Sequence, residues 1–180
     1  MHLIESSLTT DDAEHDLTLE GFETEFLTKG VGKGIATYYK ASKFIPSERV
    51  ISEKFQITKF RHEDLDIINI YRSQAGNSLE VLETIKKLHT PGMPTIISGD
   101  FNICFIENKS NRLIEGLLSI GFKQLIHEPI HIRGRHIDHV YFLDPTDSMR
   151  LTLERYSPYY SDHDGICITI QRVENGTRLK

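Results

Sequence analysis

The sequence predicts an α/β domain built as a sandwich of two β-sheets flanked by helices. Two observations support this prediction. Apolar segments with the length or alternation of strands occupy most of the chain, whereas only two segments carry apolar residues at helical spacing. The small number of helices and the long strand runs favour a sandwich over a single doubly wound sheet, although periodicity alone leaves that second architecture open.

The first half of the chain is predicted to be mostly strand. Residues 3–4 have the character of the end of a strand, and a polar loop follows at 6–16. Further strands are expected at 35–39, 55–60 and 65–71. The glycine-rich segment 30–34 is expected to form the turn before the first of these strands.

The second half of the chain adds both predicted helices. Residues 78–89 have apolar residues at helical spacing behind a serine cap, and Pro91-Gly92 ends the pattern. Residues 111–120 are expected to form the second helix, which Gly121 ends. Strands are expected at 95–97 and then near 122–126, 136–142, 151–156 and 165–171.

Length and composition describe one ordinary globular domain. A chain of 180 residues with 38% hydrophobic and 26% charged residues can bury a core without disulfides or a structural metal. The domain is expected to span 1–172, followed by a polar tail at 173–180. Cys104 and Cys167 are far apart and both lie in apolar runs, so both are expected to be buried as small hydrophobic residues.

The net charge of −5 bears on the partners that the protein can have. Strong binders of nucleic acid are usually basic, so this charge argues mildly against tight non-specific DNA binding. It is compatible with a metal-dependent nuclease, because the metal supplies the positive charge in a carboxylate site. The apolar stretches are far shorter than the ~20 residues of a membrane span, and residues 1–5 do not resemble a signal peptide. We therefore expect an intracellular protein, in the nucleus or the cytoplasm.

The sharpest local signal is the segment 96–102. An apolar strand ends there at Gly99, and Asp100 and Asn102 follow two residues apart. Because residues i and i+2 of an extended chain face the same side, both side chains can address one small ligand at the carboxyl end of the strand. For this segment taken alone, an Asx turn that closes the strand is an equal alternative.

Two further motifs each lie beside an apolar strand. Asp138 stands within the apolar run 136–142, where a buried carboxylate needs a polar partner. His163, in the segment 161–164 just ahead of the last strand, is a candidate for that partner. Histidine is the side chain best suited to proton transfer near neutral pH. The alternative for either segment alone is a polar loop.

The order of these motifs resembles a known family. Gly-Asp-Phe-Asn at 99–102, Ile-Asp-His at 137–139 and Ser-Asp-His at 161–163 together resemble the endonuclease/exonuclease/phosphatase family. That family includes apurinic endonucleases, pancreatic-type deoxyribonuclease and the endonuclease domains of non-LTR retrotransposons. The segments 3–5, 32–36 and 69–72 resemble further strands of the family, and the phrasing of 133–141 is most like the versions in mobile elements.

The resemblance implies a four-layer, DNase-like sandwich and a phosphodiester hydrolase that needs Mg²⁺ or Mn²⁺ and acts on DNA. In this comparison Glu5 corresponds to a metal ligand, and Asp162 supports the metal side of the site. Hard carboxylate oxygens suit either cation. The metal would neutralise phosphate oxygens and stabilise the leaving oxyanion.

The resemblance also implies a role for each catalytic residue. Asp100 would position or deprotonate the attacking water, and Asn102 would donate to the charge that develops on phosphorus. His163 would pair with Asp138 and act as a base or as a phosphate contact. Tyr71 would contact the phosphate or assist the leaving group.

Two departures from the family's pattern affect the expected activity. The family usually has a strand ending in asparagine before the glutamate strand, whereas only residues 1–4 precede Glu5 here, so the domain is expected to be incomplete and to lack its first strand. A threonine often stands ahead of the Ile-Asp-His strand, where this chain has Ile130. The alternatives to a DNA endonuclease are therefore a weakly active or inactive remnant or binding module of the same fold, and a phosphatase of the same family.

Two other patterns receive less weight. His127, His131, His136 and His139 form a histidine cluster in the sequence, but they lack cysteine partners, and the last two face opposite sides of a strand, which argues against zinc. The glycines at 30–34 lack the Gly-Lys-Ser/Thr ending of a phosphate-binding loop and precede a strand rather than a helix.

Overall fold

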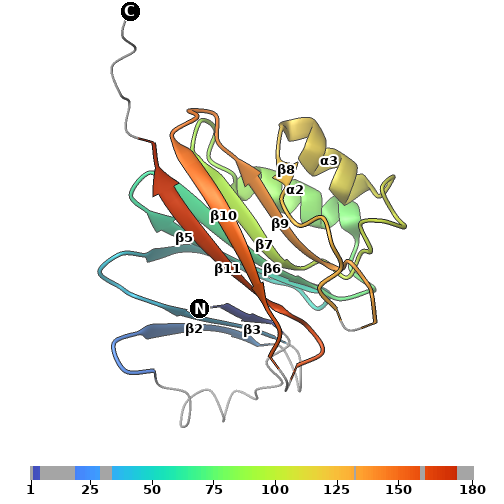
Figure 1. Ribbon diagram of the computed structural model, residues 1–180, viewed down its shortest axis with the longest axis horizontal. Helices are drawn as coiled ribbons and strands as arrows, with labels where there is room; N and C mark the ends of the chain where they lie inside the picture. The colour runs from blue at the N-terminus through green and yellow to red at the C-terminus, as the bar shows by residue number, and fades with distance from the viewer. Residues whose placement is uncertain (1, 5–18, 29–33, 132, 159–160, 174–180) are drawn as a thin grey trace, which may run out of the picture.

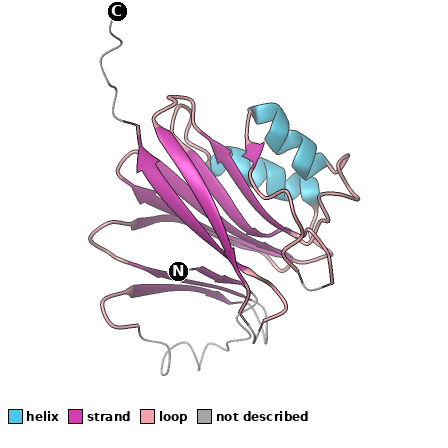
Figure 2. Cartoon of the chain, in the orientation of Figure 1, coloured by secondary structure: helices cyan, strands magenta, loops and turns pink. Residues whose placement is uncertain are grey.

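The computed structural model describes residues 2–4, 19–28, 34–131, 133–158 and 161–173. These residues form two layers of strands, and both described helices pack on the outer face of the larger layer (Figure 1, Figure 2). The predicted sandwich of two sheets flanked by helices is confirmed.

The larger layer is a six-stranded sheet in the order β4-β5-β6-β7-β9-β8. Its strands are β4 (Ile45–Ile51), β5 (Phe55–His62), β6 (Leu65–Arg72), β7 (Thr95–Asp100), β8 (Lys123–Gln124) and β9 (Asp138–Leu143). β6 and β7 are parallel and are connected through helix α2 (Ser78–Leu88), since a parallel pair needs a crossover connection. The other paired strands of this sheet are antiparallel.

The second layer consists of two groups of strands. β1 (His2–Ile4), β2 (Glu23–Thr28) and β3 (Gly34–Tyr39) form an antiparallel sheet in the order β1-β3-β2. β10 (Met149–Tyr156) and β11 (Gly165–Arg172) form an antiparallel pair. Thr28 of β2 lies opposite Gly34 of β3, so the glycine-rich segment connects a hairpin, although residues 29–33 themselves lie outside the described residues.

The helices cover one face of the six-stranded sheet. Helix α2 is capped by the Asn77 side chain, one residue ahead of the serine expected in that role, and α3 (Arg112–Ile120) ends at Gly121 in the left-handed conformation. The apolar faces of both helices pack on alternate residues of the central strands, such as Ile68 and Ile70 of β6. The main hydrophobic core lies between these helices and the six-stranded sheet.

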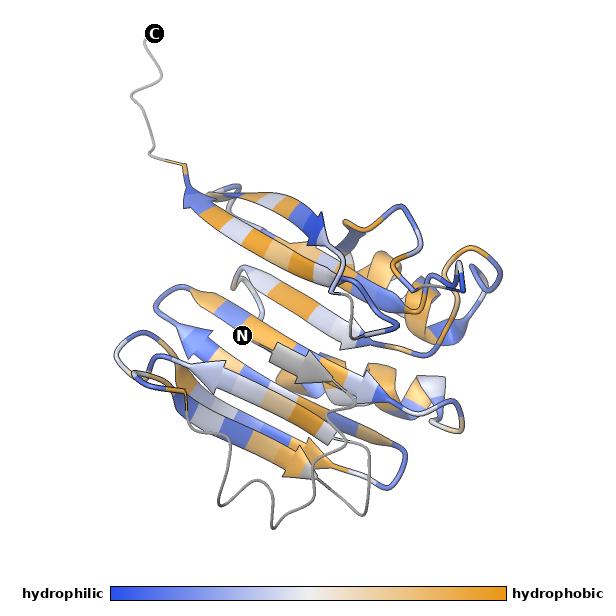
Figure 3. Ribbon diagram, turned by 60° about the horizontal axis from the view of Figure 1, so that its bottom comes forward, coloured by the Kyte–Doolittle hydropathy of each residue, from blue (hydrophilic) through white to orange (hydrophobic). Residues whose placement is uncertain are grey.

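The intervening residues of the central strands face the second layer. Ile67 of β6 and Val140 of β9 belong to an apolar cluster with β10 and β11, and Tyr71 of β6 packs with Leu27 and Ile35 of the other strand group. Because both faces of these strands are covered, their sequences form nearly continuous apolar runs. Apolar and polar residues alternate along β10, whereas β11 has an apolar run at 166–168, and these sequences give the banding in Figure 3.

A cleft of about 960 Å³ lies between the two strand groups of the second layer. Phe60, Ile67 and Val140 of the six-stranded sheet line it, together with Tyr38 of β3 and Ile168 of β11. Within the described ranges, β1 and β11 are both edge strands. The position beside β1 that the family resemblance assigns to a preceding strand therefore has no paired neighbour among the described residues.

Several elements differ from the sequence-based expectations. The strands β2 and β4 were not predicted, because β2 mixes glutamates with apolar residues and β4 is mostly exposed. The strand expected at 122–126 is reduced to β8, and the strand expected at 136–142 begins at Asp138. Cys104 is buried as expected, but the prediction for Cys167 is wrong: it is exposed, because it lies on the edge strand β11 beside the cleft. Neither described helix has the length and apolar character needed to cross a membrane.

Candidate active site

The Gly99–Asn102 segment ends β7 at the cleft. At Gly99, where φ is 144°, an added Cβ would lie 1.9 Å from the Ile70 carbonyl oxygen, so glycine is required for β6 and β7 to approach each other here. The chain then turns, and Asn102 adopts a left-handed φ of 49°. Its backbone N–H donates to Asp100 Oδ1 at 2.7 Å, so the Asx turn foreseen as an alternative is present.

The Asn102 side chain holds the Asp100 carboxylate. Its Nδ2 donates to Asp100 Oδ2 at 2.7 Å and to the Arg72 carbonyl oxygen at 2.9 Å, which commits both amide hydrogens. Asp100 is only 2% exposed. Both carboxylate oxygens of Asp100 therefore receive a hydrogen bond from Asn102, and their orientation is fixed.

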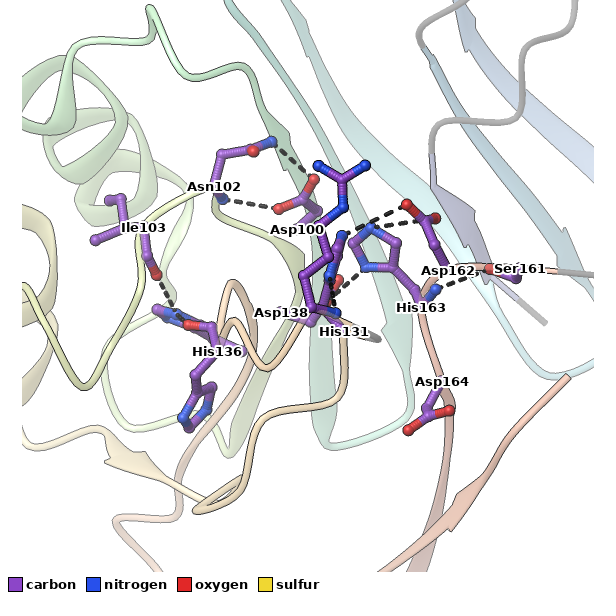
Figure 4. A network of polar contacts seen from close by, with 12 residues as sticks. Asp100, Asn102, Ile103, His131, His136, Asp138, Ser161, Asp162, His163 and Asp164 are labelled. Carbon is purple, nitrogen blue, oxygen red and sulfur yellow. Dashed lines mark hydrogen bonds and ion pairs between the residues drawn. The ribbon is translucent and has the colours of Figure 1, made fainter. Parts of the chain in front are cut away.

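Asp138 and His163 form the expected hydrogen bond. His163 Nδ1 lies 2.7 Å from Asp138 Oδ2. Asp138 is directly opposite Asp100 in the register of β7 and β9, and His163 forms an antiparallel bridge with His131. Strand pairing thus brings three distant motifs into one cluster, with Asp100 on one side and His163 on the other (Figure 4).

The surroundings of His163 favour its charged form. The hydrogen bond that His163 donates to Asp138 and the negative charges of Asp138, Asp100 and Asp162 raise the pKa of His163 from 6.5 to about 9 against the opposing effect of burial. Because Nδ1 faces Asp138, Nε2 carries the second proton and lies 3.9 Å from Asp162 Oδ1. His163 can therefore donate a charge-assisted hydrogen bond to an anion.

Asp162 and His131 lie beside this pair. The Asp162 side chain is 58% exposed, and His131 Nε2 is 3.4 Å from Asp162 Oδ2. His131, Asp162 and His163 each present a ligand atom within 4.8 Å of the others. However, His131 Nδ1 accepts a hydrogen bond from the Arg133 backbone N–H at 3.0 Å, so Nε2 of the neutral ring carries the proton and offers a donor rather than a metal-binding lone pair.

His139, the histidine of the Ile-Asp-His motif, supports the site from within the core. Its Nε2 donates to the Ile103 carbonyl at 2.9 Å, its Nδ1 lies 3.0 Å from the Tyr141 hydroxyl, and its ring stacks on Phe101 at 4.7 Å. Burial lowers the pKa of His139 to about 4, so the ring is neutral. It fixes the chain that follows Asp100.

Comparisons with known proteins were made at the level of sequence and of structure. No protein-family model and no curated protein sequence matches the chain. Solved structures do match. The endonuclease domain of TRAS1, a telomere-specific non-LTR retrotransposon, is 17% identical with a TM-score of 0.62, covering 83% of this chain and 78% of that one.

Two other matches cover a similar extent. Truncated Caenorhabditis elegans TDP2 is 16% identical with a TM-score of 0.63, covering 94% of this chain and 83% of that one. An endonuclease/exonuclease/phosphatase family protein from Bacteroides thetaiotaomicron is 15% identical with a TM-score of 0.54, covering 84% and 74%. The chain has the endonuclease/exonuclease/phosphatase fold. The resemblance inferred from the motif order is thereby confirmed for the fold.

This endonuclease/exonuclease/phosphatase fold brings most of the predicted site residues together. Asp100, Asp138, Asp162 and His163 line the cleft, and Asn102 is hydrogen-bonded to Asp100. Tyr71 lies opposite Asp100 in the register of β6 and β7, but its ring is 3% exposed and does not line the cleft. Glu5 lies outside the described residues.

Two residues of the site were not singled out by sequence reasoning. His131 was considered only as part of a histidine cluster, and its place beside His163 depends on a bridge between segments far apart in the chain. Arg72 was noted only as part of a strand motif, yet its guanidinium reaches the carbonyl oxygens of Phe101 and Asn102. No local pattern in the sequence indicates either contact.

Proposed function

We propose that the chain is a divalent-metal-dependent phosphodiesterase that cleaves DNA. The observation that supports this best is the position of Asp100, held by Asn102, across from the Asp138–His163 pair. A carboxylate that accepts a proton and an imidazolium that donates to an oxyanion, placed on two sides of one cleft, are the groups that hydrolysis of a phosphodiester needs.

Asp100 is the proposed proton acceptor. Each of its oxygens accepts a hydrogen bond from Asn102, which orients the carboxylate toward an attacking water in the cleft that Asp100 lines. As the water oxygen bonds to phosphorus, its proton passes to Asp100. The ester P–O bond breaks, and the leaving oxygen departs with the bonding pair as an oxyanion, whose charge a bound cation would stabilise. Because both Asn102 amide hydrogens are committed, Asn102 serves here to orient Asp100 rather than to contact the phosphate.

His163 is the proposed phosphate contact. A pKa of about 9 keeps its proton at neutral pH, which favours donation from Nε2 to a phosphate oxygen over action as a base. Asp138 holds the ring in the orientation that directs Nε2 into the cleft. Tyr71 has no part in this scheme, because its ring is buried against the second layer.

The donor chemistry fits a hard divalent cation. The exposed Asp162 carboxylate makes its ion pairs with His131 and His163, so no lysine or arginine within the described ranges neutralises it. We propose that Asp162, together with Glu5, would hold Mg²⁺ or Mn²⁺. The bound cation would supply positive charge to the phosphate oxygens.

DNA is the proposed substrate for two reasons. The TRAS1 protein is described as an endonuclease domain of a retrotransposon, and the motif phrasing at 133–141 is most like that branch. With a net charge of −5, binding of a nucleic acid would depend on the cation and on local donors such as His163 rather than on a basic surface.

Nicking of supercoiled plasmid tests the proposal. We expect nicking with Mg²⁺ and none with excess chelator, and a loss on the order of a thousand-fold for Asp100→Asn and for His163→Ala. Asp147→Asn, which alters an exposed carboxylate outside the cleft, is the matched control and should retain the wild-type rate. Hydrolysis of small phosphomonoesters without nicking of plasmid would favour a phosphatase. Hydrolysis that continues in excess chelator would exclude the proposed metal dependence.

A further inference from the structure

Arg72 is a buried cation whose side-chain hydrogen bonds all go to backbone carbonyls. It ends β6 and is 6% exposed. Its Nη1 donates to the Phe101 carbonyl at 2.9 Å and lies 3.5 Å from the Asn102 carbonyl, and its Nη2 donates to the Gly76 carbonyl at 2.5 Å. Burying a guanidinium is costly unless its hydrogen bonds are satisfied.

The Arg72 backbone takes part in the same arrangement. Its carbonyl oxygen accepts a hydrogen bond from Asn102 Nδ2 at 2.9 Å, and the other hydrogen of that amide goes to Asp100. The Arg72 side chain therefore holds the carbonyl groups of the 101–102 turn, while the Arg72 backbone carbonyl holds the side-chain amide of Asn102. Asn102 has a left-handed φ of 49°, a conformation that asparagine adopts more readily than most residues and that its hydrogen bonds to Asp100 hold here.

We propose that Arg72 is a positioning residue for the reaction: acting through Asn102, it holds the turn that aims the Asp100 carboxylate into the cleft. This inference rests on the proposed function, since Asp100 is the proton acceptor there. Arg72 does not line the cleft, so it acts on the orientation of Asp100 and not on substrate binding.

The geometry favours arginine over lysine at this position. The planar guanidinium reaches carbonyls on two sides, those of the 101–102 turn and that of Gly76 in the loop ahead of α2. Gly76 is part of the fit, because a Cβ there would lie 2.7 Å from Arg72 Cγ. Arg72 thus ties the turn to the loop in which Asn77 caps helix α2.

The test compares Arg72→Met and Arg72→Lys with Lys59→Met. Lys59 is a matched control because it is also a buried cation, 4% exposed, that donates to a backbone carbonyl, that of Leu88, at the other end of the sheet. For Arg72→Met we expect kcat to fall about 100-fold with KM unchanged, since a small misplacement of a reacting group costs about that much. Arg72→Lys should recover part of kcat, and Lys59→Met should lose thermal stability without loss of kcat.

Hydrogen exchange provides a readout that does not depend on activity. The backbone N–H of Asn102 donates to Asp100 Oδ1. Its hydrogen should exchange faster in Arg72→Met than in Lys59→Met when the two variants are compared at the same decrease in thermal midpoint. Gly76→Ala should produce the same change by displacing the Arg72 stem, so the proposal remains testable if Arg72→Met does not fold.

The outcomes separate the two proposals. Unchanged kcat in Arg72→Met, or equal exchange of Asn102 in the Arg72 and Lys59 variants, would overturn the positioning role. A rise in KM with kcat intact would overturn it as well, because it would place Arg72 in substrate binding. A wild-type protein with no hydrolytic activity would contradict the proposed function, while the exchange measurement would still decide whether Arg72 holds the turn.

Discussion

Substitution of Asp138 by asparagine should change the pH dependence of the reaction more than its maximal rate. Asp138 accepts the Nδ1 proton of His163 at 2.7 Å, and this contact is the largest cause of the raised pKa of His163. The carboxamide of Asp138→Asn can still accept a hydrogen bond but carries no charge. The pKa of His163 should therefore fall from about 9 toward its ordinary value of 6.5.

The size of the effect follows from that difference. A change from 6.5 to about 9 corresponds to roughly 3 kcal/mol in favour of the imidazolium. At pH 8 the wild-type ring is about 90% protonated, whereas a ring with a pKa of about 6.5 is about 3% protonated. If the protonated ring contacts the phosphate, Asp138→Asn should lose up to about 30-fold in rate at pH 8 but less than about two-fold at pH 6.

Two measurements check this prediction. Titration of the His163 ring C–H signals by NMR gives both pKa values directly, and pH–rate profiles of plasmid nicking should show an alkaline limb that moves to lower pH in the variant. Asp162→Asn is the comparison, and its shift should be smaller, because the charge it removes lies 3.9 Å from the ring instead of 2.7 Å. If nicking instead rises with pH through about 9, and the variant exceeds the wild type at pH 8, His163 is a base and the phosphate-contact assignment is wrong.

Two further predictions concern stability. Burial lowers the pKa of His139 from 6.5 to about 4. The free energy of unfolding should therefore decrease by roughly 3 kcal/mol as the pH falls from 6.5 toward 4. The urea midpoint should drop in that pH range in the wild type and not in His139→Gln. The second prediction concerns the unpaired edges of β1 and β11 beside the cleft. We expect an added strand to pair with β1 or β11 and raise the thermal midpoint, if it is an extended segment with alternating apolar residues, fused ahead of β1 through a flexible linker. A scrambled segment of the same composition is its control, and equal midpoints for both fusions would mean that the cleft does not accept a strand.

The sequence predicted the parts of the fold whose causes are local. Helical spacing and end signals located both helices to within a few residues, and the apolar runs located the central strands. The edge strand β4 was missed because it is mostly exposed, so its sequence carries a weak apolar pattern. The edge strand β2 was missed because glutamates stand among its apolar residues, although Leu27 is buried. Cys167 was misassigned for a related reason, since an apolar run indicates burial only if a neighbouring strand covers it.

The candidate site shows the same division. Motif order pointed to Asp100, Asn102, Asp138, Asp162 and His163 as one cluster, and the structure brings them together. The buried state of Tyr71 and the contacts of Arg72 and His131 were not accessible in that way. Each depends on which strand or loop covers the residue from another part of the chain, and no residue spacing encodes that contact.

The register of the central strands explains why the motif order was informative at all. Tyr71, Asp100 and Asp138 lie in one row across β6, β7 and β9. A slip of one residue would turn Asp100 toward the helices, because successive residues of a strand face opposite sides. Gly99 protects this register, since only glycine tolerates the Ile70 carbonyl at that distance. Gly99 is therefore required by the packing of β6 against β7. The same packing fixes the register that places Asp100 on the face of the sheet where His163 lies.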